Sequence, residues 1–193
     1  MPDKLGVYNG ALSTYLDTRP LKTLSDARTE RRALDGVYDE TLKWMLEQAM
    51  WNFATKTEQW MSSDTAEPEF GYRFFFEKPD DYVRLVKISE DERFGSVLAD
   101  FSEEGDFFAA DCDPLYVMFV SDDITAGSDP GKWGTAFAAA FEAELAWRAR
   151  GGVKPLGAQE IETLQKIKRR LMNDAKSKDV VNQAPGIPYA GRL

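Results

Sequence analysis

Paired carboxylates are the residue type in this chain that could do chemistry, and five acidic clusters occur between residues 80 and 123. Two carboxylates at a fixed separation, one of them with a raised pKa, hydrolyse glycosidic bonds, and carboxylates also bind divalent cations. The clusters are Asp80-Asp81, Glu90-Asp91-Glu92, Glu103-Glu104, Asp111 with Asp113, and Asp122-Asp123. Adjacent acidic residues in turns are usually solvated and unperturbed, so the pattern favours exposed turns over a catalytic pair.

Other kinds of catalytic site are excluded by what the chain lacks. It contains no histidine, which removes Ser-His-Asp and Cys-His nucleophilic sites as well as His-ligated zinc. It contains neither of the glycine-rich patterns that cradle phosphate groups. Its single cysteine, Cys112, cannot form an internal disulfide or a cysteine metal cluster and fits a reducing site of synthesis. We therefore expect no catalytic residues, no metal and no cofactor.

Basic residues gather near the C-terminus and could bind either nucleic acid or an acidic protein surface. They are Lys166, Lys168, Arg169, Arg170, Lys176 and Lys178. The chain has 33 acidic and 24 basic residues and a net charge of -9. Residues 61–129 hold 18 acidic and 5 basic residues, whereas residues 151–193 hold 4 acidic and 8 basic ones. This segregation indicates a subunit oriented between charged neighbours, although solvated faces would give the same pattern.

The composition predicts a folded protein of one domain or two small ones. Of the 193 residues, 43% are apolar and 30% are charged, which is too apolar for a disordered chain. No apolar run approaches the roughly 18 residues that a membrane span needs, so we expect no membrane contact.

Helical periodicity predicts four helices, two on each side of a central section. The first covers about residues 3–18 with Asp3 as its cap, and the second begins in the capping pattern Thr23–Asp26 and continues to about Phe53. The third covers about 132–150, where Gly151-Gly152 ends it, and the fourth covers about 158–175. Apolar residues at helical spacing predict the core, including Leu34, Tyr38, Met45, Phe53, Trp133, Phe137 and Phe141.

The central section is rich in aromatic and β-branched residues separated by Pro, Gly and Asp, which is typical of an antiparallel meander or small sandwich. The expected strands are Glu58–Met61, Tyr72–Phe76, Tyr82–Ile88, Val97–Phe101, Phe107–Ala109 and Tyr116–Val120. The predicted fold class is α+β: a bundle of about four helices with an inserted antiparallel β section and an extended C-terminal tail. We assign residues 1–57 and 130–175 to the helical domain, 58–129 to the β section and 176–193 to the tail.

The N-terminal part of the chain carries a series of motifs in a fixed order. Tyr8-Asn9-x-Ala11-Leu12 precedes Arg19-Pro20-Leu21 and then Leu24-x-Asp26-x-Arg28-x-x-Arg31-Arg32-x-Leu34-Asp35-x-Val37-Tyr38-Asp39. The series ends in Leu46-Glu47-Gln48-Ala49-x-Trp51-Asn52-Phe53-Ala54. It resembles the opening of the tail tubular protein A family, the head-to-tail adaptors of short-tailed bacteriophages.

Two later segments resemble the same family. They are residues 72–85, around Lys78-Pro79-x-Asp81-Tyr82, and residues 113–120, which begin Asp113-Pro114-Leu115-Tyr116. The resemblance extends in order over most of residues 5–175. The C-terminus departs from it, because Pro185-Gly186-Ile187-Pro188-Tyr189 stands where family members often have a basic Pro-Gly-Arg-Trp ending.

The resemblance implies a structural virion protein rather than an enzyme. Such adaptors form a twelve-subunit ring beneath the portal protein, support the tail nozzle protein, and surround the channel for double-stranded DNA. Helical domains build the ring wall, and the β section faces the tail. A net negative charge suits this channel, because a basic lumen would retain DNA through phosphate contacts. The expected location is the head–tail junction of the virion, after synthesis in the host cytoplasm.

Under the same resemblance, the C-terminal tail is the segment expected to dock on the portal. Its prolines favour an extended form, and Ile187, Tyr189 and Leu193 are expected to enter apolar pockets. Lys176, Lys178 and Arg192 would then pair with acidic portal residues. Two alternatives stay open: a carboxylate-based glycan hydrolase carried by a virion protein, and a terminase-type DNA-binding subunit that uses the basic final helix.

Overall fold

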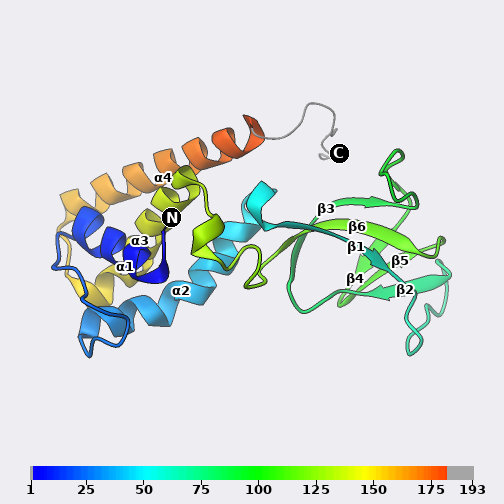
Figure 1. Ribbon diagram of the computed structural model, residues 1–193, viewed down its shortest axis with the longest axis horizontal. Helices are drawn as coiled ribbons and strands as arrows, with labels where there is room; N and C mark the ends of the chain where they lie inside the picture. The colour runs from blue at the N-terminus through cyan, green and yellow to red at the C-terminus, as the bar shows by residue number, and fades with distance from the viewer. Residues whose placement is uncertain (1, 182–193) are drawn as a thin grey trace.

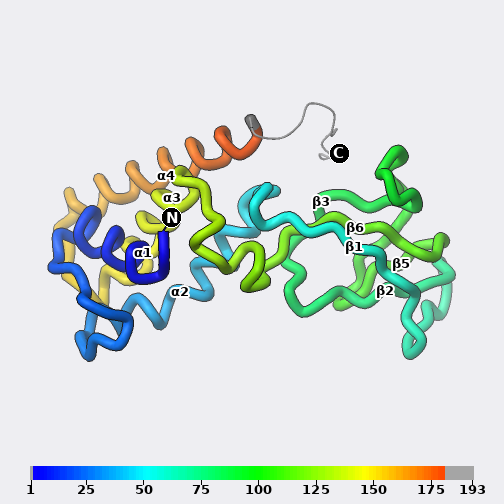
Figure 2. Tube along the Cα trace, viewed as in Figure 1, coloured from blue at the N-terminus to red at the C-terminus, as the bar shows by residue number. Residues whose placement is uncertain are grey.

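The computed structural model describes residues 2–181, and in it a helical lobe and a β lobe are joined end to end (Figure 1). The helical lobe (residues 2–54 and 122–181) contains α1 (Lys4–Gly10), α2 (Thr29–Glu47), α3 (Thr135–Val153) and α4 (Ala158–Val181). The β lobe comprises residues 55–121, and the chain passes between the lobes twice, after α2 and before α3 (Figure 2). The predicted α+β class is confirmed.

The predicted apolar stripe of the second helix forms the centre of the helical lobe. Leu34 and Met45 are fully buried, and the ring of Tyr38 lies 5.2 Å from that of Phe141 on α3 in an edge-on arrangement. Phe53 is partly buried and packs on Phe137, with ring centroids 4.7 Å apart. The prediction that these residues form a buried stripe is therefore confirmed, with α1 and α3 supplying the facing side chains.

Both boundaries of the second helix differ from the prediction. It begins at Thr29, because the Asp26 side chain accepts from the Arg28 backbone N–H (3.2 Å) in the turn before the helix rather than capping it from Thr23–Asp26. It ends at Glu47, after which the Trp51 indole N–H donates to the Met45 carbonyl oxygen (2.8 Å). That bond folds the chain back over the helix end, so Phe53 reaches the core from a 3-10 turn.

The first helix is capped as predicted but is shorter. Asp3 Oδ1 accepts from the Gly6 backbone N–H (2.7 Å), and α1 continues as a π-helical turn over Ala11–Tyr15. The helical stretch therefore ends at Tyr15 rather than near residue 18.

The third helix passes through Gly151-Gly152, so the prediction that these glycines end it is wrong. A Cβ atom on Gly152 would lie 2.9 Å from the Cβ of Ala33 on α2. The glycine therefore permits a close approach of two helices inside the lobe, and α3 ends only at Val153.

The β lobe contains two three-stranded antiparallel sheets, ordered β1-β6-β3 and β2-β5-β4. The strands are β1 (Thr55–Trp60), β2 (Phe74–Glu77), β3 (Tyr82–Ser89), β4 (Ser102–Glu104), β5 (Phe107–Ala110) and β6 (Leu115–Ser121). Trp60, Phe76, Phe108 and Phe119 fill the space between the sheets. The strand predicted over Val97–Phe101 is absent from the described residues, because that stretch is a loop whose Leu98 and Phe101 pack on this core.

Candidate functional site

The structure describes two of the six residues that are predicted to dock on the portal. Lys176 and Lys178 lie on α4, and Lys178 is exposed. The other four, Ile187, Tyr189, Arg192 and Leu193, lie outside the described residues.

The prediction of an extended tail is wrong for residues 176–181, which continue the fourth helix to Val181. No glycine or proline interrupts these six positions, and the preceding Ala175 is buried at 2% exposure. A helix with a buried contact and no breaker continues until such a breaker is reached.

The last turns of α4 are fixed to the turn that joins the two lobes. The Asn52 backbone N–H lies 3.2 and 3.3 Å from the two carboxylate oxygens of Asp179, and Asn52 Nδ2 donates to the Asp179 carbonyl oxygen at 2.9 Å. Burial raises the pKa of Asp179, against the opposing effect of the hydrogen bond from Asn52. These contacts bring the motif around Asn52 next to the part of α4 that was predicted to belong to the docking tail.

Other polar residues of the N-terminal motifs hold the helical lobe together. The Tyr8 hydroxyl on α1 donates to Asp35 Oδ1 on α2 at 2.6 Å. The Asn9 side chain both donates to the Leu21 carbonyl oxygen (3.1 Å) and accepts from the Leu21 N–H (2.7 Å). The motifs therefore consist largely of residues that fix local structure.

Two of the acidic clusters meet at a lysine near the base of the β lobe. Lys56 Nζ lies 2.7 Å from Asp81 Oδ2 and 3.5 Å from Asp123 Oδ2. Burial opposes ionisation of Asp81, but hydrogen bonds from Lys56 and Ser121 outweigh it and lower the pKa of this carboxyl group. Hydrogen bonds from Thr125 similarly lower the pKa of Asp123. A glycosidase acid needs the opposite shift, which burial gives to the neighbouring Asp122 but not to the two carboxyl groups that face Lys56.

The carboxyl group of Glu142 on α3 does have a raised pKa, but it lies at a helix–helix contact. Burial raises its pKa to about 7. It packs over Gly10 of α1, where a Cβ atom would overlap the carboxyl group. The position matches a packing role between α1 and α3 and leaves no space for a glycan. Within residues 2–181, no cluster of three or more acidic or cysteine side chains could hold a metal ion.

The basic stretch of the fourth helix is smaller on the surface than the sequence suggests. Lys168 turns inward, with its Nζ 3.0 Å from Glu144 Oε2, and it is only 19% exposed. Glu144 is itself 2% exposed and also pairs with Arg148 Nε at 3.0 Å. This buried charge network joins α3 to α4, whereas Arg169 and Arg170 remain exposed on the outer face of α4.

Three loops meet at the end of the β lobe away from the helices, and we call this surface the far β face. It comprises residues 61–73, 90–101 and 111–114. The Tyr72 hydroxyl donates to Asp100 Oδ1 (2.7 Å), and the Ser62 hydroxyl donates to Asp113 Oδ2 (2.8 Å), so each loop is tied to another.

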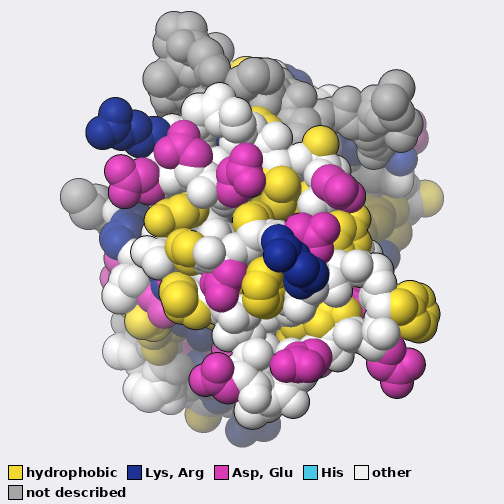
Figure 3. Space-filling model, turned by 90° about the vertical axis from the view of Figure 1, so that its right-hand side faces the viewer, with side chains coloured by type: hydrophobic (Ala, Val, Ile, Leu, Met, Phe, Trp, Pro, Cys, Tyr) yellow, Lys and Arg dark blue, Asp and Glu magenta, His cyan; other side chains and the backbone are white. Residues whose placement is uncertain are grey.

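The far β face combines negative charge with exposed apolar side chains. The three loops hold nine acidic and two basic residues. Met61 is 62% exposed, Phe70 is 87% exposed and Val97 is 40% exposed. Figure 3 shows apolar and acidic side chains interspersed over this end of the molecule. Large apolar groups exposed among charges are typical of a protein-binding surface.

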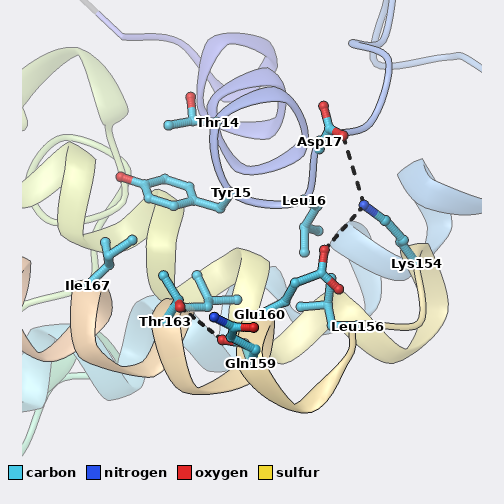
Figure 4. A pocket seen from close by; sticks show the side chains of 11 residues that line it. Thr14, Tyr15, Leu16, Asp17, Lys154, Leu156, Gln159, Glu160, Thr163 and Ile167 are labelled. Atoms are coloured by element: carbon cyan, nitrogen blue, oxygen red, sulfur yellow. Dashed lines mark hydrogen bonds and ion pairs between the residues drawn. The ribbon is translucent and has the colours of Figure 1, made fainter.

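A groove of about 320 Å³ lies between the end of the π-helical turn and the start of α4 (Figure 4). Leu16, Leu164 and Ile167 give it an apolar lining. Lys154 lies at its rim, 4.0 Å from Asp17 Oδ2 and 3.7 Å from Glu160 Oε1. Both carboxylates thus face a lysine, which differs from the substrate-facing pair of a glycosidase.

Sequence reasoning missed Asp179 and Glu144. Glu144 had a signal, because it is an acidic residue inside the Ala-rich apolar stretch of the third helix, four positions before Arg148. Asp179 had none, since its partner Asn52 lies 127 positions away in the sequence. Only the packing of α4 across the lobe brings the two together.

Comparison of the chain with models of known protein families finds no match, and neither does comparison with curated proteins. No helix within residues 2–181 has the length and apolarity needed to cross a bilayer.

Proposed function

We propose that this protein is a structural subunit of a head-to-tail adaptor in a short-tailed bacteriophage. Copies of the chain form a closed ring that joins the portal protein to the tail nozzle protein and surrounds the DNA channel. Its role is mechanical and requires no catalytic residues or cofactor. The ordered motif series up to Ala54 supports the family, and the resemblance implies twelve copies.

The observation that carries the proposal is the end-to-end arrangement of two lobes with different exposed chemistry (Figure 1). The helical lobe presents Arg169 and Arg170 on the outer face of α4, which ends at Val181 near the lobe junction. The β lobe presents the acidic and apolar far β face at the opposite end. An adaptor needs one surface for each of two partners, and this molecule has two separated surfaces of different character.

We assign the helical lobe and the C-terminal segment to the portal, and the far β face to the nozzle. Exposed basic residues of α4 suit an acidic protein surface, either on the portal or on the neighbouring copy in the ring. The net charge of -9 opposes retention of DNA, so the genome passes without sequence-specific contacts. Repetition around a ring allows weak contacts to add, because each copy is held by two neighbours as well as the portal.

Truncation of the chain after Val181 tests the portal assignment. The truncated protein keeps all of α4, so we expect unchanged helicity and unchanged thermal unfolding, but no attachment to portal-bearing heads in electron micrographs. The full-length chain is the positive control. Attachment of the truncated protein at full occupancy would show that portal docking belongs to another part of the molecule.

A gel-shift series with double-stranded DNA tests the terminase-type alternative. A DNA-binding subunit would give a shift that weakens steeply as salt rises, because phosphate contacts release counterions. We expect no shift at physiological salt for the adaptor. A strong, salt-dependent shift that Arg169→Ala and Arg170→Ala abolish would favour the DNA-binding function instead.

A further inference from the structure

The contact between Asn52 and Asp179 engages a backbone group of each residue. The Asn52 N–H is the first donor of the 3-10 turn Asn52–Ala54, which has no side-chain cap of its own. The Asp179 carboxylate accepts from this N–H at 3.2 and 3.3 Å. In return, Asn52 Nδ2 donates at 2.9 Å to the Asp179 carbonyl oxygen on α4. The 3-10 turn and α4 are therefore joined in both directions, with Asn52 as donor through its backbone and its side chain.

A carboxylate at position 179 does not stabilise α4 by itself. The carboxyl end of a helix carries partial negative charge, so a carboxylate in the last turn is unfavourable for the helix in isolation. Asp179 is also half-buried, and burial raises its pKa. Its position is explained by the bonds to Asn52 and by their effect on where the end of α4 lies.

The end of α4 lies at the junction of the two lobes. Asn52 precedes β1 by three residues, and Ala54 and Trp51 beside it are buried in the core of the helical lobe. The turn is therefore a rigid support, and α4 crosses the lobe to reach it (Figure 1). One turn earlier, Ala175 is buried as well, so α4 packs on the lobe up to this contact.

We propose that Asn52 and Asp179 are positioning residues that fix the end of α4 at the lobe junction and thereby set the point from which the C-terminal segment leaves the subunit. The consequence for docking rests on the proposed function; the position of the helix end does not. In the ring, every copy then holds the end of α4 at the same position. Such preorganisation lowers the entropic cost of docking on a repeated partner surface.

Spin labels measure the position of the helix end directly. Cys112→Ser removes the single native cysteine, and Thr57→Cys on β1 and Ser177→Cys on α4 place one label on each side of the junction at exposed sites. In this background we expect one narrow distance distribution. Asn52→Ala and Asp179→Ala should each broaden it by roughly twofold, because the last turn frays when its cross-contact is lost.

Two further variants separate positioning from a general loss of stability. Asp179→Asn keeps an oxygen acceptor for the Asn52 N–H, so its distribution should stay narrow. Asn173→Ala removes an exposed asparagine from the same helix and should also leave the distribution narrow. Attachment of Asn52→Ala and Asp179→Ala to portal-bearing heads should weaken by about fivefold, with Asp179→Asn close to the unaltered chain.

The outcomes distinguish the two proposals. An unchanged distance distribution in both alanine variants would overturn the positioning role. A broadened distribution with undiminished attachment would overturn its link to docking. Failure of the unaltered chain to attach would contradict the proposed function, while the label distances would still decide whether Asn52 and Asp179 position the end of α4.

Discussion

The two lobes bury their aromatic side chains in different ways. The helical lobe buries Phe141 completely, and this ring contacts Tyr38 and Trp133 with ring centroids 5.2 and 4.7 Å apart. The β lobe buries Phe108 between two short sheets but leaves Phe70 almost fully exposed in a loop. The difference indicates that the helical lobe is the more rigid of the two, whereas the far end of the β lobe exposes apolar side chains of the kind found at protein interfaces.

The largest stability effect is expected at the centre of the helical lobe. Phe141→Ala removes a fully buried ring and should lower the free energy of unfolding by about 3–5 kcal/mol, through lost transfer energy and the cavity left behind. Urea denaturation followed by far-ultraviolet circular dichroism measures this change. Leu24→Ala, at a residue that is 43% exposed, is the matched control and should change little. A small effect at Phe141 would contradict the description of this lobe as the more rigid of the two.

The second-largest effect on stability depends on pH and is also expected in the helical lobe. Burial raises the pKa of Glu142 to about 7, compared with 4.5 for the ordinary group. Between these values the unfolded chain loses the proton while the folded chain keeps it, so stability falls as pH rises from about 4.5 to about 7. A shift of this size corresponds to about 3 kcal/mol across the window.

Glu142→Gln tests this pH dependence because glutamine is neutral and of similar size. We expect the variant to be more stable than the unaltered protein at pH 8 and about equal to it at pH 4. The quantity to measure is the difference in unfolding free energy between the two proteins across this range. A difference that does not grow with pH would show that the Glu142 carboxyl is hydrated in the folded protein.

A third prediction uses the neighbouring glycines of α3, which the structure places in different surroundings. Gly152→Ala would bring a Cβ atom to 2.9 Å from Ala33 and should destabilise the protein by about 1–3 kcal/mol through overpacking. Gly151→Ala meets no atom within 4 Å and should stabilise the helix by about 0.5–1 kcal/mol. Thermal unfolding of the two variants should therefore shift in opposite directions. Shifts of the same sign would mean that α2 and α3 are less closely packed than described.

The sequence was sufficient where apolar spacing alone determines the structure. Leu34 and Met45 recur at helical spacing and are buried, and the change to alternating patterns predicted the β lobe. The sequence was insufficient where a contact between residues far apart in the chain determines the structure. Gly152 looked like a helix end because its partner, Ala33, is far away in the sequence, and the sequence does not show that the two helices touch there.

In the candidate site too, local chemistry predicts some side-chain positions and contacts between distant residues determine others. The outward position of Lys178 followed from its charge, whereas Lys168 turned inward to a glutamate on another helix. Similarly, Leu98 looked like a strand residue because burial in a loop and burial in a strand select the same residue types. Local chemistry predicts that a side chain will be buried; the tertiary arrangement decides in which element.

The smallest stability effect is expected at the far β face, and it would complete the comparison. Phe70 is 87% exposed and Met61 is 62% exposed, so Phe70→Ser and Met61→Ser should each change the free energy of unfolding by less than about 0.5 kcal/mol. If the face contacts the nozzle, the same substitutions should weaken binding to purified nozzle protein by at least about tenfold, because exposed aromatic and methionine side chains are frequent anchors of interfaces. Ile124→Ser is the matched control, since Ile124 is 77% exposed but lies outside the three loops.

Equal binding by all three variants would show that the apolar side chains of the far β face do not contact the nozzle. Loss of binding in Phe70→Ser and Met61→Ser alone, at unchanged stability, would show that the β lobe has a contact surface separate from its core.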